Sequence, residues 1–145
     1  MTVGASVATL LRRGVRDLLA DLDLGCPIIA GNLTASNDPG GAIVTVVTYP
    51  AGDTTEEIGA GQTITACQVS VRSGPHDGSD PVTDMQEAIR DALTWVTPRD
   101  INGVTVVLSH RQTTSAPPIP DDRGRPTVYD TYDMRSGRPG LIPSL

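Results

Sequence analysis

The order of the hydrophobic periodicities constrains this chain more than any other feature. Apolar residues recur with helical spacing over about 3–22 and 80–96. They alternate, or run without interruption, in four shorter segments: 42–49, 63–72, 104–112 and 127–135. The order helix, strand, strand, helix, strand, strand predicts an α+β fold, in which a four-stranded, mainly antiparallel sheet carries both amphipathic helices on one face.

The two predicted helices each have an apolar stripe that suits packing on a sheet. The first helix carries three arginines on its other side: Arg12, Arg13 and Arg16. Gly14 weakens the middle of this helix by up to about 1 kcal/mol. The second helix is predicted to begin with Asp80 as its N-cap and Pro81 as its first residue, and Pro98 ends it.

The first two strands are predicted to pair as a long hairpin. Segment 42–49 is β-branched and apolar on both faces, which indicates an inner strand or one covered on both sides. Segment 63–72 alternates and places Cys67 on its apolar face, as a small buried hydrophobe. The polar connection between the two strands puts three acidic residues at the hairpin tip: Asp53, Glu56 and Glu57.

A single domain accounts for all 145 residues. We expect its core over about 3–135 and an extended Pro/Gly tail at 136–145. The chain contains 15 Gly and 12 Pro, which predicts long loops between the regular elements. Phe is absent and Trp occurs once, so the core is mainly aliphatic. Two cysteines do not make a disulfide framework, which favours synthesis in a reducing cytoplasm.

Composition and spacing argue against several classes of function. The net charge of −6 disfavours a general cationic face for nucleic acid or anionic lipid, and no apolar run reaches the ~18 residues of a membrane span. No nucleophile elbow is present, and Asp121-Asp122 lacks the spacing of an EF-hand loop. The soft metal ligands are not spaced for zinc: Cys26, Cys67, His76 and His110. We therefore expect no enzyme, no catalytic residues, no cofactor and no metal.

Several short segments, taken in order, resemble a known family. Gln68–Gly74 is a strand that ends in Arg, and an amphipathic helix follows it. Ile101–Val104 then leads into a strand and a Pro-containing loop, and Asp121–Pro126 precedes a last strand with Tyr129 and Tyr132. In order and spacing these segments resemble the tail terminator proteins of long-tailed bacteriophages, also called minor capsid or tail completion proteins.

The resemblance implies a structural protein of the virion, located at the tail–head junction and made in the bacterial host cytoplasm. Such a protein forms a homohexameric ring that caps the tail tube, stops its polymerisation and presents a surface for head–tail joining. Its partners are copies of itself, the major tail tube protein and a head–tail connector or stopper, while DNA passes the lumen without specific binding. Two alternatives stay open: a head-side neck component, and a small ligand-binding or enzymatic α+β domain.

A closed ring needs two different patches on each subunit, one meeting the other on the next copy. We expect the acidic tip to provide one patch, through Asp53, Glu56 and Glu57. The candidate residues of the other patch are arginines near the C-terminal strand: Arg123, Arg125, Arg135 and Arg138. Solvated loops with no partner are the alternative for both groups.

Overall fold

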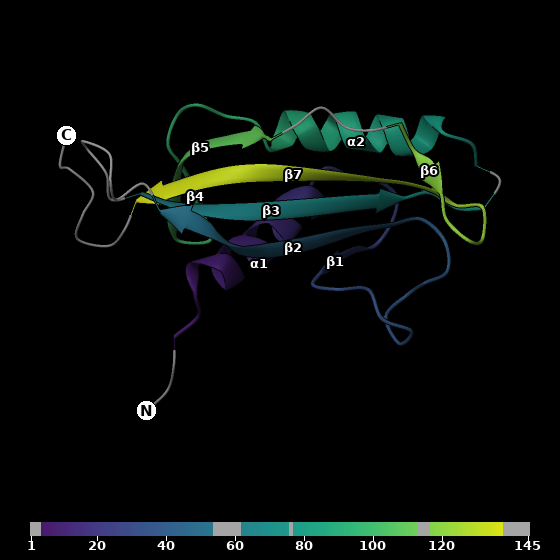
Figure 1. Cartoon of the computed structure of the whole chain (residues 1–145), viewed down its shortest axis with the longest axis horizontal. Helices are drawn as coiled ribbons and strands as arrows, with labels where there is room; N and C mark the ends of the chain where they lie inside the picture. Colours follow the sequence, from purple (N-terminus) through teal and green to yellow (C-terminus); the bar gives the residue numbers. More distant parts are fainter. Residues whose placement is uncertain (1–3, 54–61, 76, 113–116, 138–145) are drawn as a thin grey trace.

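The computed structural model describes residues 4–53, 62–75, 77–112 and 117–137 of the chain. Its strands form a seven-stranded sheet in the order β1-β2-β3-β7-β5-β4, with β6 paired to β7 off this path (Figure 1). The elements are α1 (Val7–Ala20), β1 (Ile28–Ala30), β2 (Ile43–Asp53), β3 (Gln62–Arg72), α2 (Asp80–Ala92), β4 (Arg99–Ile101), β5 (Val104–Arg111), β6 (Ile119–Pro120) and β7 (Pro126–Gly137).

The α+β class is confirmed, whereas the predicted number of four strands is wrong: the described sheet has seven strands, and among them only β1 and β2 pair in parallel. The four predicted strands exist as β2, β3, β5 and β7, and β2 pairs antiparallel with β3 as expected. Three further strands lie outside the predicted four: β1, which runs parallel to β2, and the short strands β4 and β6. They contain three, three and two residues, too few for an alternating pattern to show.

The last described strand occupies the middle of the sheet. β7 lies between β3 and β5 and pairs antiparallel with both. Its pairing with β3 runs without a shift from Gln62 opposite Gly137 to Arg72 opposite Thr127. β7 therefore continues two residues beyond the predicted end of the core at 135.

Both helices cover one face of this sheet. Alternate residues of β2, β3 and β7 point to that face and are buried: Val44, Val46, Cys67, Val69, Val71, Val128, Tyr132 and Met134. Leu11 and Val15 of α1 join the same cluster as Val82 and Ile89 of α2. Ile43 and Ala66 are also buried but belong to the opposite face and lie outside the cluster.

Gly14 has a packing role that its low helix propensity conceals. A Cβ at this position would lie 2.7 Å from Ile101 Cγ2 and 2.8 Å from Asn102 Cβ, in the turn between β4 and β5. Asn102 has a φ of 52° and Gly103 a φ of 84°, as a tight Asn-Gly turn requires. The Asn102 side-chain amide donates to the Leu10 carbonyl over 3.0 Å. Gly14 therefore lets α1 approach this turn closely.

The boundaries of the second helix differ from the predicted ones. Ser79, one residue earlier than expected, is the N-cap, and the helix ends at Ala92 instead of about 96. The backbone of Trp95 pairs with Ser109 of β5, and its indole nitrogen donates to the Val106 carbonyl over 3.1 Å. These sheet contacts draw the chain away from the helix, even though the apolar spacing continues to Val96.

Candidate functional site

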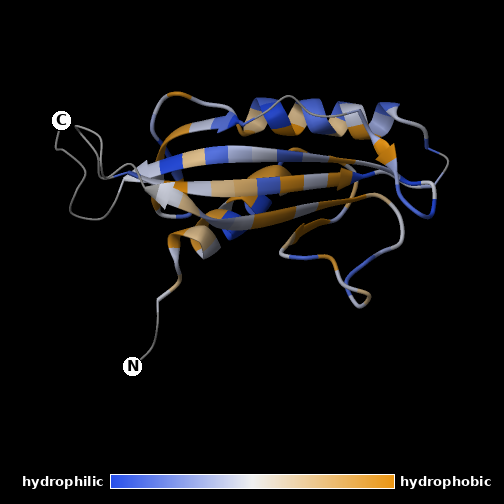
Figure 2. Ribbon diagram, in the orientation of Figure 1, coloured by the Kyte–Doolittle hydropathy of each residue, from blue (hydrophilic) through white to orange (hydrophobic). Residues whose placement is uncertain are grey.

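The face of the sheet opposite the helices is the candidate interaction surface. Its residues alternate along β2, β3 and β7 with those of the core, and most carry hydroxyl, amide or charged groups: Thr45, Tyr49, Gln68, Ser70, Tyr129, Thr131, Asp133 and Arg135. Figure 2 shows the polar residues along these strands and the polar outer side of α2. This surface is called the helix-free face below.

Exposed apolar side chains gather on or beside the helix-free face. Tyr49 and Tyr129 belong to it by strand alternation, and they are 46% and 62% exposed. Ile119 of β6 pairs with Thr127 of β7, so it points to the same side. Leu33 lines a depression together with Tyr129. Exposed tyrosines and aliphatic groups of this kind are typical of surfaces that bind other proteins.

The depression beside Tyr129 has a volume of about 290 Å³. Its lining mixes apolar and polar groups: Leu33, Ile43, Thr45, Ser70, Arg72, Asp121, Thr127 and Tyr129. The hydroxyls of Thr45 and Ser70 are hydrogen-bonded to each other, and Arg72 and Asp121 are engaged with other residues of the chain. The depression therefore offers few free polar groups to a small ligand.

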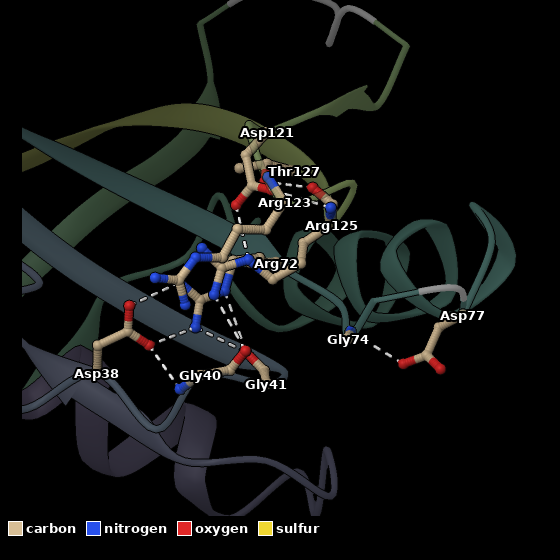
Figure 3. Close-up of polar contacts among 10 residues, drawn as sticks. All are labelled: Asp38, Gly40, Gly41, Arg72, Gly74, Asp77, Asp121, Arg123, Arg125 and Thr127. Atoms are coloured by element: carbon tan, nitrogen blue, oxygen red, sulfur yellow. Dashed lines mark hydrogen bonds and ion pairs between the residues drawn. The ribbon is translucent and has the colours of Figure 1, made fainter.

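Arg72, the last residue of β3, is buried and fully engaged within the chain (Figure 3). Its guanidinium forms a two-pronged ion pair with the Asp38 carboxylate, over 2.6 and 3.1 Å. It also donates twice to the Gly41 carbonyl, over 2.7 and 3.0 Å. The Arg72 hydrogen bonds and the backbone N–H of Gly40 hold the pKa of Asp38 well below its usual range.

Arg125 repeats this arrangement from the turn before β7. Its side chain donates to the Asp121 carboxylate over 2.8 Å and to the Gly40 carbonyl over 3.0 Å. Burial alone would raise the pKa of Asp121, but the backbone N–H groups of Arg125 and Arg123 and the Arg125 side chain lower it overall. Gly124 has a φ of 72°, which closes this turn. The two arginines together fasten residues 38–41 to one end of the sheet.

The predicted interface residues fall at opposite ends of the sheet. Asp53 is the last residue of β2, and Arg135 lies near the same end, opposite Ile64 and Leu108. Arg123 and Arg125 lie together at the far end, in the turn between β6 and β7. Glu56, Glu57 and Arg138 lie outside the described residues.

The three described arginines differ in their availability. Arg125 is buried and paired within its own chain, as given above. Arg123 is exposed, and among the described residues its guanidinium forms no ion pair. The Nε atom of Arg135 is buried and lacks a hydrogen-bond partner in the described part of the chain. Arg123 is thus the arginine whose charge is most accessible to a neighbouring molecule.

The sequence patterns did not single out the pairing of Arg72 with Asp38. Arg72 was noticed only as the end of a strand, and Asp38 belongs to a loop rich in Gly and Pro. An Asp before Pro39-Gly40-Gly41 was the available signal, because such loops bring backbone carbonyls within reach of a cation. Arg72 is 34 residues from Asp38 along the chain, so no local pattern indicates that the two side chains pair.

The described residues were also compared with the requirements of a metal site, a nucleophilic cysteine and a membrane-spanning helix. Within them, no group of three or more His, Cys, Asp and Glu side chains could hold a metal ion. Burial raises the pKa of the Cys67 thiol to about 12, so it is a poor nucleophile at neutral pH. Among the helices described, none has the length and apolar character to cross a membrane.

The fold has counterparts among solved structures. It superposes with a TM-score of 0.67 on a chain from the virion of a native gene transfer agent (GTA) particle, at 16% sequence identity, covering 92% of this chain and 99% of that one. A second solved structure superposes with a TM-score of 0.57 at 17% identity, over 90% of this chain and 96% of the other. No protein-family model and no curated protein matches the sequence. At these identities the likeness establishes a common fold.

Proposed function

We propose that this chain is a structural protein of a phage-like virion, and specifically a tail terminator at the tail–head junction. Six copies form a ring that caps the tail tube, stops its polymerisation and provides the head–tail joining surface. The observation that carries the proposal is the fold shared with a chain of the gene transfer agent virion, over nearly the whole length of both chains. The resemblance of Gln68–Arg135 to tail terminators supports the finer role.

The chemistry of the surface favours assembly over catalysis. The polar groups of the depression are engaged within the chain, while Tyr129 and Leu33 are exposed at its lining. Burying such side chains against another protein contributes roughly 25 cal/mol per Å² of apolar area removed from water. A steric and interfacial role needs no convergent catalytic groups.

The ends of the sheet offer the two patches that a closed ring requires. β3 has 11 residues, which at about 3.3 Å each separate its ends by about 35 Å. Asp53, the described residue of the acidic tip, belongs to one end, and exposed Arg123 belongs to the other. We place the tip of one copy against Arg123 and the depression beside Tyr129 on the next copy. This contact joins unlike patches and is attractive in charge.

Native mass spectrometry of the purified chain, alone and mixed with tail tube protein, tests the proposal. A six-copy species is expected, either alone or once tubes are present, and electron microscopy should show tubes that stop elongating. A chain that stays monomeric and leaves tube growth unchanged overturns the terminator role. Binding to connector-bearing heads in preference to tubes would assign it to the head side of the neck.

The ring contact is tested by reversing one charge. Arg123→Glu should weaken association of the copies, because it sets a carboxylate against the acidic tip. Arg99→Glu is the comparison variant: Arg99 is also exposed, but it lies on β4 at the Asp53 end of the sheet, so reversing its charge sets no carboxylate against the acidic tip of the neighbouring copy. Equal assembly of the two variants would argue against the predicted contact.

A further inference from the structure

The outer side of α2 is a ridge of carboxylates. Its four members are all exposed and recur at spacings of four, three and four residues, which places them in one row: Asp80, Asp84, Glu87 and Asp91. The row lies directly opposite the buried side of the helix, which carries Val82, Met85 and Ile89. Arg90 pairs with Glu87 over 3.3 Å, and the other three carboxylates have no ion pair within the described part of the chain.

The solvent side of α1 has the opposite charge. Arg13 and Arg16 are exposed on the side away from Leu11 and Val15, and Arg12 is partly exposed at the edge of that side. Arg16 contacts its neighbour Asp17 over 2.8 Å in a solvated pair. Arg12 and Arg13 form no ion pair with any described residue. Two helix faces of opposite sign are therefore exposed on the same chain.

The charged ends of these helices lie toward opposite ends of the sheet. α1 lies toward the Asp53 end, because the Asn102 amide in the turn between β4 and β5 donates to the Leu10 carbonyl. That turn leads to Val106, which lies in one row with Ser136, Thr63 and Asp53. α2 starts at the other end, shortly after β3 ends at Arg72, where Ser73 N–H donates to the Pro126 carbonyl. Figure 1 shows α2 beginning near β6, while α1 begins toward the opposite side of the view.

We propose that the α1 arginines of one copy bind the carboxylates at the start of α2 on the next copy. Arg12 and Arg13 of the first copy face Asp80 and Asp84 of the second. This pairing rests on the head-to-tail association proposed above and adds a second complementary contact to that of the tip with Arg123. One end of the molecule then carries a negative tip beside a positive helix, and the other end carries the reverse.

Sedimentation velocity of the full chain, over a dilution series, tests the pairing. Asp84→Arg and Arg13→Glu are each expected to raise the dissociation constant of the copies by about tenfold or more, because attraction is replaced by repulsion. A chain that carries both substitutions should recover most of the affinity, since the ion pair between positions 13 and 84 is restored with its charges exchanged. Raising the salt concentration should weaken the unmodified assembly, as exposed charges are screened.

Asp91→Arg is the matched control for position. It makes the same change of charge on the same ridge, but seven residues further along, which is about 10 Å on an α-helix. Its effect on the dissociation constant should be clearly smaller than that of Asp84→Arg. Far-ultraviolet circular dichroism of each variant confirms that the helices are intact.

The outcomes separate this pairing from the proposed function. If Asp84→Arg and Arg13→Glu assemble as the unmodified chain does, while Arg123→Glu dissociates, the helix pairing is wrong and the tip contact stands. Failure of the doubly changed chain to recover affinity also overturns the helix pairing. If the unmodified chain stays monomeric even with tail tubes, the ring itself is wrong.

Discussion

The two faces of the sheet divide into one buried under the helices and one that is helix-free, and β7 shows this division most clearly. Tyr132 points toward the helices and is fully buried, whereas Tyr129, three residues earlier on the same strand, is 62% exposed on the helix-free face. Strand alternation places these two tyrosines on opposite faces of the sheet, since their positions differ by an odd number of residues. The comparison teaches that side chains of one type on one strand can be buried in the core on one face and exposed on the opposite face.

The polar groups of the two faces also bind different parts of the chain. On the helix-covered face, buried Asp130 accepts from the Gln86 amide of α2 over 2.9 Å and lies 3.9 Å from Arg111. That pairing ties a helix to the sheet. On the other face, Arg72 and Arg125 tie a loop to the end of the sheet and so shape the depression beside Tyr129.

The sharpest test of this division is to replace a tyrosine by alanine on each face and compare the two variants. Tyr132→Ala should lower the free energy of unfolding by about 3–5 kcal/mol, because it leaves a cavity in the core. Tyr129→Ala should change it by less than about 0.5 kcal/mol and should instead weaken association of the copies. Urea unfolding and sedimentation velocity measure the two effects. Similar losses of stability for both variants would refute the division.

The next largest effect is expected at the end of the helix-free face. Arg72→Met removes both donors to the Gly41 carbonyl, and losing hydrogen bonds to a charged group costs about 1.5–3 kcal/mol. Residues 38–41 should then become more accessible to proteolysis, which limited digestion followed by mass spectrometry detects. Arg123→Met is the control, because it removes an exposed arginine from the same end. Equal digestion of both variants would mean that Arg72 does not hold the loop.

A smaller loss is expected where the first helix meets the β4–β5 turn. Gly14→Ala introduces overpacking worth about 1–3 kcal/mol, partly offset by the roughly 1 kcal/mol gain in helix propensity. The net result is a lower thermal midpoint. Gly4→Ala, where a Cβ meets nothing within 4 Å, should leave the midpoint unchanged. A raised midpoint for Gly14→Ala would show that α1 can move away from the turn.

The smallest expected effect concerns acid stability. The pKa of Asp38 is lowered in the folded chain, so its contribution to stability is complete above the ordinary aspartate pKa of about 3.9. That contribution decreases as the pH falls from there through the folded pKa. Asp38→Asn should therefore show a shallower loss of stability between about pH 5 and pH 2 than the unmodified chain. Parallel urea midpoints against pH would contradict the pairing with Arg72.

Local patterns in the sequence were sufficient for the long elements and their faces. The alternation at 63–72 correctly placed Cys67 in the core, because the geometry of a strand decides which residues share a face. The position of β7 between β3 and β5 depends on contacts between segments far apart in the chain, which no local pattern records. The same holds for Arg72, Asp38 and Arg125, and for the charge that α1 and α2 expose at opposite ends.

The central position of β7 has a consequence for how the chain folds during synthesis. β7 leaves the ribosome after every other described element, yet both β3 and β5 need it as a neighbour. Pairing Gln62 with Gly137 must close a long stretch of chain, and such distant pairings slow folding. Until then two strands have open edges on which unfinished chains can pair. The sheet of a nascent chain can therefore be completed only after β7 has been synthesised.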